Sequence, residues 1–346
     1  DHCGANHAVA VCNATAALHI ACLASDLGPG DWLWTSPNTF VASANCGLYC
    51  GAKVDFVDID PITLNMDPAA LEAKLKDAER AGCLPKVVIP VHFSGLPCDM
   101  EKIGALASKY GFTVIEDASH AIGSKYRNVP TGAGTYSAMT VFSFHPVKIV
   151  TTGEGGMIVT NRRDLFDRLS RLRTHGITRD PAFMEGESEG PWYYQQVDLG
   201  YNYRITDIQA ALGESQIKRL DAFVATRNRL ADRYDRLLSG LPLRVPGRRA
   251  DSYSSFHLYV VRVDLGKVKR GRREVFENLR AAGIGVNLHY IPVHLQPYYR
   301  KLGFKAGDFP RSEEYYREAI SLPLYFDLSE PDQDKVVRSL ESALGT

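Results

Sequence analysis

Short apolar runs alternate with amphipathic segments over the first 160 residues, and this alternation constrains the fold most strongly. The apolar runs are rich in valine, isoleucine and aromatic residues, which is typical of strands. Strands joined through helices pair in parallel, and a parallel sheet is covered by helices on both faces. We therefore predict an α/β fold with a mostly parallel central sheet. The predicted strands are residues 9–12, 32–35, 53–59, 86–93, 113–117, 139–144 and 157–159, and the predicted helices are 16–25, 37–48, 68–76 and 99–110.

The pattern changes after Asn161. We predict an amphipathic helix at 162–173, a loop at 180–196 and a long helical stretch at 205–239 that breaks near Asp221. Helices and strands then alternate over shorter distances. The chain is long enough for two domains, and we predict a large domain at 1–224 and a smaller α+β domain at 225–346. The later predicted elements are strands at 254–263 and 286–290 and helices at 272–282, 313–319 and 330–344.

Composition excludes several classes of protein. The chain has 40 basic and 40 acidic residues, which argues against a nucleic-acid-binding face and against a membrane-surface protein. No apolar run reaches the length of a transmembrane helix. The seven cysteines are odd in number and mostly lie in apolar patterns, so we expect free thiols in a cytoplasmic protein and no metal site. Because the chain opens on Asp1 and enters a strand almost at once, we expect an N-terminal segment to be missing.

Lys148 lies in an irregular loop between two predicted strands. The loop follows the apolar run 139–144 and ends in the glycine-rich turn 153–156. A solvated lysine is the ordinary occupant of a surface loop. At the end of a core strand, however, the sheet fixes the origin of the side chain, and partial burial lowers the pKa of its amine. A lysine placed in this way suits covalent chemistry with a carbonyl group.

Asp117 ends the predicted strand 113–117, and an acid there faces the crevice in which open α/β sheets bind ligands. Pyridoxal phosphate (PLP) requires a lysine for a Schiff base, a carboxylate that keeps its ring nitrogen protonated, and donors for its phosphate. Lys148 and Asp117 meet the first two requirements. The turn 13–15, which opens a helix, offers the Thr15 hydroxyl and backbone N–H groups to a dianion, and Ser143 offers a second hydroxyl.

Other candidate residues have a structural alternative. His120 either approaches the cofactor ring or its phenolic oxygen, or is a core histidine bonded to backbone. Phe40 either stacks on the ring or belongs to the core. Asn202 and Arg204 either reach a phosphate or cap the helix that follows.

The segment 289–294 carries two histidines near the end of a predicted strand. His289 and His294 are either a zinc pair or polar contacts to substrate, and we favour substrate contacts for both, together with Tyr290.

Five motifs that span nearly the whole chain in the right order resemble those of the DegT/StrS family of PLP-dependent nucleotide-sugar aminotransferases. They are NATAAL at 13–18, EDASH at 116–120, SFHPVK at 143–148, GEGG at 153–156 and GYNYR at 200–204. The segment 289–299 further resembles the branch of that family that serves pseudaminic acid biosynthesis.

The resemblance implies a type I PLP-dependent transferase fold and a homodimer that shares its active sites. It implies that Lys148 forms the internal aldimine, that Asp117 pairs with the pyridinium nitrogen and that His120 contacts the ring oxygen. Further residues take their roles from the same resemblance. The phosphate would be held by Thr15, Ala16 and Ser143, with Asn202 from the other subunit; Phe40 would stack on the ring; and substrate contacts would include His145, Arg204, His289, Tyr290 and His294.

The activity that the resemblance implies is amino transfer from L-glutamate to the C4 keto group of a UDP-linked 4-keto-6-deoxy-N-acetylhexosamine. The same chemistry on a GDP- or dTDP-linked keto-sugar, or on a UDP-4-keto-pentose, is the first alternative. A non-catalytic regulatory relative is a remote one, because charge balance and the lack of a helix-turn-helix signal disfavour nucleic-acid binding.

Overall fold

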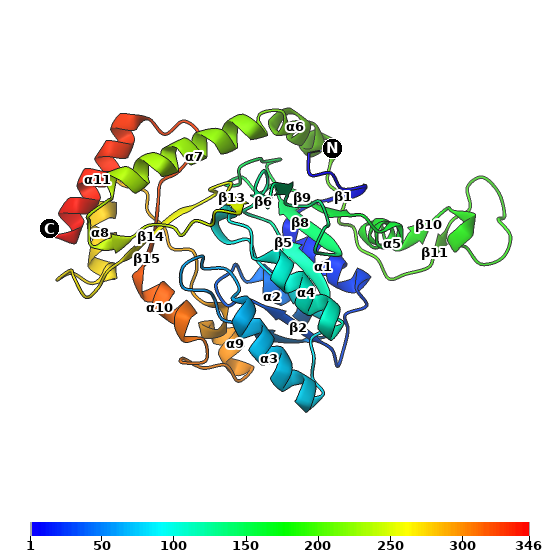
Figure 1. The fold of residues 1–346 in the computed structure, drawn as a ribbon. Helices are drawn as coiled ribbons and strands as arrows, with labels where there is room; N and C mark the ends of the chain where they lie inside the picture. The colour runs from blue at the N-terminus through cyan, green and yellow to red at the C-terminus, as the bar shows by residue number, and fades with distance from the viewer. Residues whose placement is uncertain (1, 346) are drawn as a thin grey trace.

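A seven-stranded sheet forms the centre of the computed structural model, which describes residues 2–345 (Figure 1). The strand order is β1-β9-β8-β5-β4-β2-β3. Every strand runs in the same direction except β9, which is antiparallel to both of its neighbours. This confirms the predicted α/β fold with a mostly parallel sheet. The strands are β1 His7–Val11, β2 Trp32–Thr35, β3 Lys53–Phe56, β4 Val87–Ile89, β5 Thr113–Asp117, β8 Met139–Ser143 and β9 Gly156–Thr160.

Helices cover both faces of this sheet. Strand β4 is apolar at every position and contacts a core on each face of the sheet. Val87 and Ile89 lie in the core with α1, α2 and α5, whereas Val88 lies in the core with α3 and α4. Successive side chains of a strand point to opposite faces, so a strand covered on both sides needs apolar residues at every position. These helices are α1 Ala14–Ala24, α2 Ala42–Tyr49, α3 Pro68–Ala81, α4 Met100–Tyr110 and α5 Arg163–Arg173.

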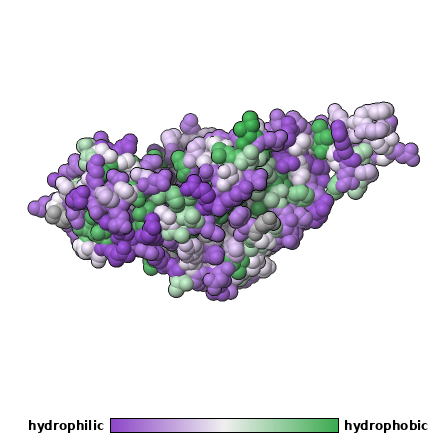
Figure 2. All heavy atoms as spheres, turned by 90° about the horizontal axis from the view of Figure 1, so that it is seen from above, coloured by the Kyte–Doolittle hydropathy of each residue, from purple (hydrophilic) through white to green (hydrophobic). Residues whose placement is uncertain are grey.

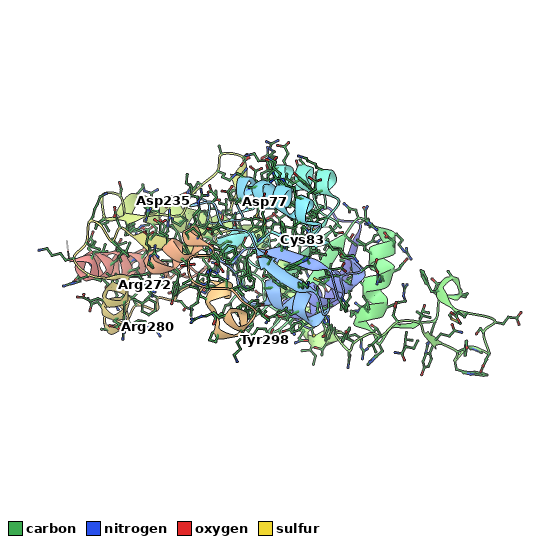
Figure 3. The ribbon with its side chains drawn as sticks, turned by 90° about the horizontal axis from the view of Figure 1, so that it is seen from below. Asp77, Cys83, Asp235, Arg272, Arg280 and Tyr298 are labelled. Carbon is green, nitrogen blue, oxygen red and sulfur yellow. The ribbon has the colours of Figure 1, made fainter. Side chains whose placement is uncertain are left out.

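The C-terminal part has a core of its own. A three-stranded antiparallel sheet in the order β12-β14-β15 packs with α8, α11 and the second half of α7. Figure 3 shows Asp235 of α7 and Arg272 and Arg280 of α8 at the end of the molecule opposite the β10–β11 arm. The elements are α7 Leu220–Leu237, β12 Leu243–Arg244, β14 Tyr259–Val263, α8 Arg272–Ala281, β15 Ala319–Leu322 and α11 Glu330–Leu344.

Helix α7 joins the two parts. Its first turns pack against Ile149 and Val150, next to the loop of Lys148, whereas its later residues from Leu230 onward belong to the C-terminal core. The predicted division between residues 224 and 225 therefore falls within one continuous helix. The long helical stretch predicted from sequence is interrupted between Ile217 and Leu220, close to the predicted break.

A narrow arm projects from the body of the molecule (Figures 1 and 2). Two residue pairs, Ile177 with Gln196 and Thr178 with Gln195, close its base as strands β10 and β11. Helix α6, Asp207–Ile217, follows the arm and has no buried residue. The remaining strands and α-helices are β6 Lys125–Tyr126, β7 Val129–Pro130, β13 Ser252–Tyr253, α9 Pro297–Lys301 and α10 Pro310–Glu318.

One prediction for the C-terminal part, the strand at 286–290, is wrong. Residues 286–290 form no strand and pair only through the single bridge between Asn287 and Ser321, because the chain then turns toward the large part, where Tyr290 meets His120. The helix predicted at 313–319 is present as α10, which ends at Glu318, and Ala319 begins β15. In the described part of the chain, 2–345, no helix combines the length and the apolar character needed to cross a bilayer. All seven cysteines are free thiols.

Candidate active site

Two neighbouring parallel strands carry the predicted site residues to one edge of the sheet. Asp117 is the last residue of β5, and Ser143 is the last residue of β8. Asp117 pairs with Val141 in β8, so the two strand ends lie side by side. Lys148 follows in the loop after β8, where its backbone N–H donates to the carbonyl of His145 at 2.9 Å. The sheet thus fixes the starting points of all three side chains.

The amine of Lys148 lies in a desolvated part of this edge. Burial lowers its pKa from the ordinary 10.5 to about 8, and the carboxylate of Asp117 opposes the shift by favouring the charged amine. Only the neutral amine attacks a carbonyl carbon, so this environment prepares Lys148 for covalent chemistry at neutral pH.

Asp117 is buried and its carboxylate is held at both oxygens. Oδ2 accepts a hydrogen bond from the Ser43 hydroxyl at 2.7 Å, and Oδ1 accepts one from the backbone N–H of Ser119 at 3.0 Å. The Ser43 hydroxyl has a single hydrogen, which it donates to Asp117, so Thr39 must donate to Ser43 across their 2.8 Å contact. This chain of donors fixes the orientation of the Asp117 carboxylate.

Glu116, the residue before Asp117, anchors the strand on the opposite face of the sheet. Its buried carboxylate accepts hydrogen bonds from Ser137, Thr140 and the Nε2 of His92, the last at 2.7 Å. The backbone N–H of Cys98 donates to Nδ1 of His92, so the imidazole proton is on Nε2. Burial by itself would raise the pKa of Glu116, but these hydrogen bonds outweigh it and hold the pKa below its usual range.

His120 is buried between the two parts of the chain. Its Nε2 lies 3.1 Å from the hydroxyl of Tyr290, and its ring lies 4.5 Å from the ring of His257. The Ser255 hydroxyl donates to the backbone carbonyl of His120 at 2.9 Å. Burial, with a smaller contribution from the charge of Lys148, lowers the pKa of His120 well below its usual range, so the imidazole is neutral.

The start of α1 faces the same edge of the sheet. Asn13 caps the helix by accepting from the N–H of Ala16 at 2.8 Å, which leaves the N–H of Thr15 among the first-turn donors without an intrahelical partner. Gly156 of β9 packs directly on this turn, because a Cβ atom at Gly156 would lie 2.7 Å from the backbone nitrogen of Ala14. The glycine-rich turn thus allows α1 to begin beside the loop of Lys148.

The segment that carries Asn202 and Arg204 runs along the outside of this region. The carbonyl of Tyr203 accepts from the N–H of Cys12 at 2.8 Å, which places the segment beside the end of β1. Asn202 and Arg204, on either side of Tyr203, are both exposed.

The predicted substrate residues do not all lie together. His145 is exposed in the loop of Lys148, with its Nε2 3.7 Å from Glu154. His289 lies near Lys148, and its Nδ1 is 2.8 Å from the Ser321 hydroxyl. Burial, together with the charge of Lys148, lowers the pKa of His289 to about 4 and keeps it neutral.

His294 lies apart from this group. Its side chain has no exposed surface, its Nε2 is 3.0 Å from Glu313, and its ring packs on Phe309. A side chain without accessible surface does not meet a substrate, so the structure removes His294 from the candidate site. In residues 2–345 no group of three or more metal-ligating side chains is arranged to hold a metal ion.

Sequence reasoning missed Ser43, Ser255 and His257. Ser43 reaches a partner 74 positions away, and Ser255 reaches one 135 positions away, so no local pattern marks either of them.

Phe40 is predicted to stack on the cofactor ring. Its side chain is 57% exposed, and the centroid of its ring lies 6.2 Å from that of Tyr290. The structure thus places the exposed ring of Phe40 beside Tyr290, whose hydroxyl contacts His120.

These residues fit PLP. A lysine with a lowered pKa, a fixed carboxylate and the beginning of a helix share one edge of the sheet. His120 adds a buried Nδ1 that has no partner in the described residues, where a ligand would meet it. The fold and the site together define a PLP-dependent enzyme of the type I fold.

Comparison with known proteins narrows this class. Residues 1–341 match the DegT/DnrJ/EryC1/StrS aminotransferase family, and the chain belongs to that family. It is therefore a PLP-dependent sugar aminotransferase, as the sequence predicts.

Three relatives illustrate the similarity. The spore coat polysaccharide biosynthesis protein SpsC of Bacillus subtilis is 42% identical over 340 residues, which cover 97% of this chain and 85% of SpsC. The putative sugar aminotransferase Spr1654 of Streptococcus pneumoniae, solved in a PLP form, is 29% identical with a TM-score of 0.88 over 99% of this chain and 88% of that one. The Helicobacter pylori aminotransferase PseC, involved in the biosynthesis of pseudoaminic acid, is 28% identical with a TM-score of 0.88 over the same shares.

Proposed function

We propose that the protein transfers an amino group from L-glutamate to the C4 keto group of a UDP-linked 4-keto-6-deoxy-N-acetylhexosamine. The observation that carries the amino transfer is the buried amine of Lys148 beside the fixed carboxylate of Asp117. Two features support the sugar: the resemblance of residues 289–299 to the pseudaminic acid branch, and the structural similarity to PseC.

Bound PLP would supply an electron sink for the carbanion that forms when a proton leaves the amino donor. Lys148 would move that proton as a base and return it as an acid, for which a pKa of about 8 is suited. Asp117 would hold the proton on the ring nitrogen, and Ser43 would keep Asp117 oriented. His120 would donate to the ring oxygen.

The remaining cofactor contacts follow from position. Thr15 and Ala16, at the first turn of α1, and Ser143, at the end of β8, would hold the phosphate. The Ala16 N–H already donates to Asn13, so we expect Thr15 and Ser143 to contribute more than Ala16. Phe40 would cover one face of the ring.

We propose further that the protein is a homodimer. Helix α6 buries none of its residues, and large apolar side chains on it and on the arm are exposed, with Ile208 86% and Trp192 70% accessible. Such a surface is typical of an interface between subunits. Asn202 lies between the arm and α6, so it would reach the phosphate of the partner's site. The substrates would be contacted by Arg204, which lies near Asn202, and by His145 and His289, which lie around Lys148.

A second candidate is the same reaction on another nucleotide-linked keto-sugar. SpsC, whose name refers to spore coat polysaccharide biosynthesis, is more similar in sequence than PseC. The residues that carry the amino transfer are common to both candidates, so only the acceptor differs. A non-catalytic regulatory role has no comparable support, since Lys148 keeps the position and the lowered pKa that catalysis needs.

The test is a panel of 4-keto nucleotide sugars offered to the PLP-loaded protein with L-glutamate, with 2-oxoglutarate release as the measurement. We expect release with the UDP-linked 6-deoxy-N-acetylhexosamine ketone and none with Lys148→Ala. Lys301→Ala, a change of an exposed lysine in α9, serves as the matched control and should retain the activity. Turnover only with a GDP-, dTDP- or pentose-linked ketone would replace the acceptor and keep the mechanism.

A further inference from the structure

A hydrogen bond to His120 crosses between the two parts of the chain. The Tyr290 hydroxyl lies 3.1 Å from Nε2 of His120. Tyr290 comes three residues after Asn287, which bridges Ser321 of β15 in the C-terminal part, whereas His120 follows β5 in the large part. The other ring nitrogen, Nδ1, is buried and has no hydrogen-bond partner among residues 2–345. His120 is only 6% exposed, so bulk water does not satisfy Nδ1.

The groups around this imidazole keep it neutral. Lys148 faces it from the loop after β8, and His257 and His289 face it from the C-terminal part. Burial and these neighbours lower the pKa of His120. Burial, with the nearby carboxylate of Asp117, raises the pKa of Tyr290, so its hydroxyl keeps its hydrogen.

A neutral imidazole has one donor and one acceptor nitrogen, so two arrangements are possible. Either Tyr290 donates to Nε2 and the proton of His120 is on Nδ1, or Nε2–H donates to Tyr290 and Nδ1 is a bare acceptor. In the described residues, His120 is the only hydrogen-bond partner of the Tyr290 hydroxyl. Nδ1 lacks a partner among the described residues in both arrangements, but the second also leaves the hydroxyl hydrogen of the half-buried Tyr290 without one, and an unpaired polar group shielded from water is costly.

Neighbouring residues hold the ring in place. The Ser255 hydroxyl donates to the backbone carbonyl of His120, and the ring of His257 lies at 40° to the imidazole. The Arg227 guanidinium in turn donates to the carbonyls of Phe256 and His257 at 3.1 and 3.2 Å. These contacts fix the position of the imidazole. The hydrogen bond to Tyr290 then favours one of its two tautomers.

We propose that Tyr290 is a positioning residue that holds His120 as the tautomer protonated on Nδ1, so that a defined N–H donor faces the ring oxygen of the cofactor. The proposal rests on the proposed function for the presence of PLP. It gives Tyr290 a role through His120, in place of the direct substrate contact that the sequence predicts.

The variant Tyr290→Phe removes the hydroxyl and keeps the ring that packs near Phe40 and Phe93. Without its partner, His120 can place the proton on Nε2 and withdraw the donor from the cofactor oxygen. That oxygen then becomes more basic, so the visible absorbance of the bound cofactor should change at a higher pH than in the wild type. We expect an upward shift of about one to two units, the size expected for losing a hydrogen bond to a charged oxygen.

A double-mutant comparison separates this role from a direct contact. A glutamine at position 120 offers an amide N–H and has no tautomers, so in the His120→Gln background Tyr290→Phe should no longer shift the midpoint. Tyr315→Phe is the matched control, since its hydroxyl lies in the same aromatic group but donates to the carbonyl of His289. We expect it to leave the midpoint unchanged.

The outcomes are distinct. An unshifted midpoint in Tyr290→Phe, or an equal shift in the His120→Gln background, would overturn the role of Tyr290. Wild-type protein that gives no visible cofactor band would instead overturn the proposed function. Cofactor stoichiometry and circular dichroism of each variant show whether it is folded and loaded when the midpoint is measured.

Discussion

The lowered pKa of Lys148 should set the pH at which cofactor-free protein accepts PLP. The neutral amine is the form that reacts with the aldehyde, and its pKa is about 8 instead of 10.5. At pH 7 this difference makes the neutral form about 300-fold more abundant than in an exposed lysine. We therefore expect the rate of loading to rise with pH and to level off above a midpoint near 8.

Stopped-flow absorbance after mixing apo-protein with PLP measures this rate. Measurements above pH 7 keep the cofactor phosphate as a dianion, whose second pKa is about 6. Asp117→Asn removes the carboxylate that favours the charged amine, so its midpoint should fall below that of the wild type. Asp77→Asn, a change of an exposed acid in α3, is the matched control (Figure 3). A wild-type midpoint near 10.5 would refute the burial of the Lys148 amine, and no change in Asp117→Asn would refute the influence of the Asp117 charge on it.

Three further predictions concern other contacts. Ser43→Ala removes a hydrogen bond to a charged carboxylate and should slow the L-glutamate half-reaction about 10- to 100-fold; an unchanged rate would exclude this support of Asp117. The folded state lowers the pKa of Glu116, so this carboxylate stabilises the folded protein above its ordinary pKa of 4.5, and the stabilisation is lost as pH falls through the folded pKa. Glu116→Gln should therefore be less stable than the wild type at pH 7 but lose less stability on acidification. Urea unfolding at several pH values measures both effects. Ile208→Glu places a charge on the exposed face of α6 and should shift sedimentation toward the monomer, whereas a stable dimer would place the interface elsewhere.

Local sequence patterns are sufficient to predict the layers of the fold and the centre of the site. Strands covered on both faces need apolar residues at every position, so β4 and β8 were recognisable from local sequence. Asp117 and Lys148 were recognisable for a related reason: each lies within a few residues of the end of a core strand, and the ends of parallel strands gather at one edge.

The residues that surround Asp117 and Lys148 are brought there by long-range packing, which local patterns do not encode. Ser43 and His257 approach Asp117 and His120 from distant parts of the sequence, and no periodicity records such contacts. The motif around residue 290 shows the limit most clearly. Tyr290 turns toward His120, whereas His294, four positions on, packs into the core against Glu313. Local sequence marks both as polar residues in one motif, but the direction of each side chain depends on the path of the backbone after the single bridge at Asn287, which is set by packing between the two parts of the chain.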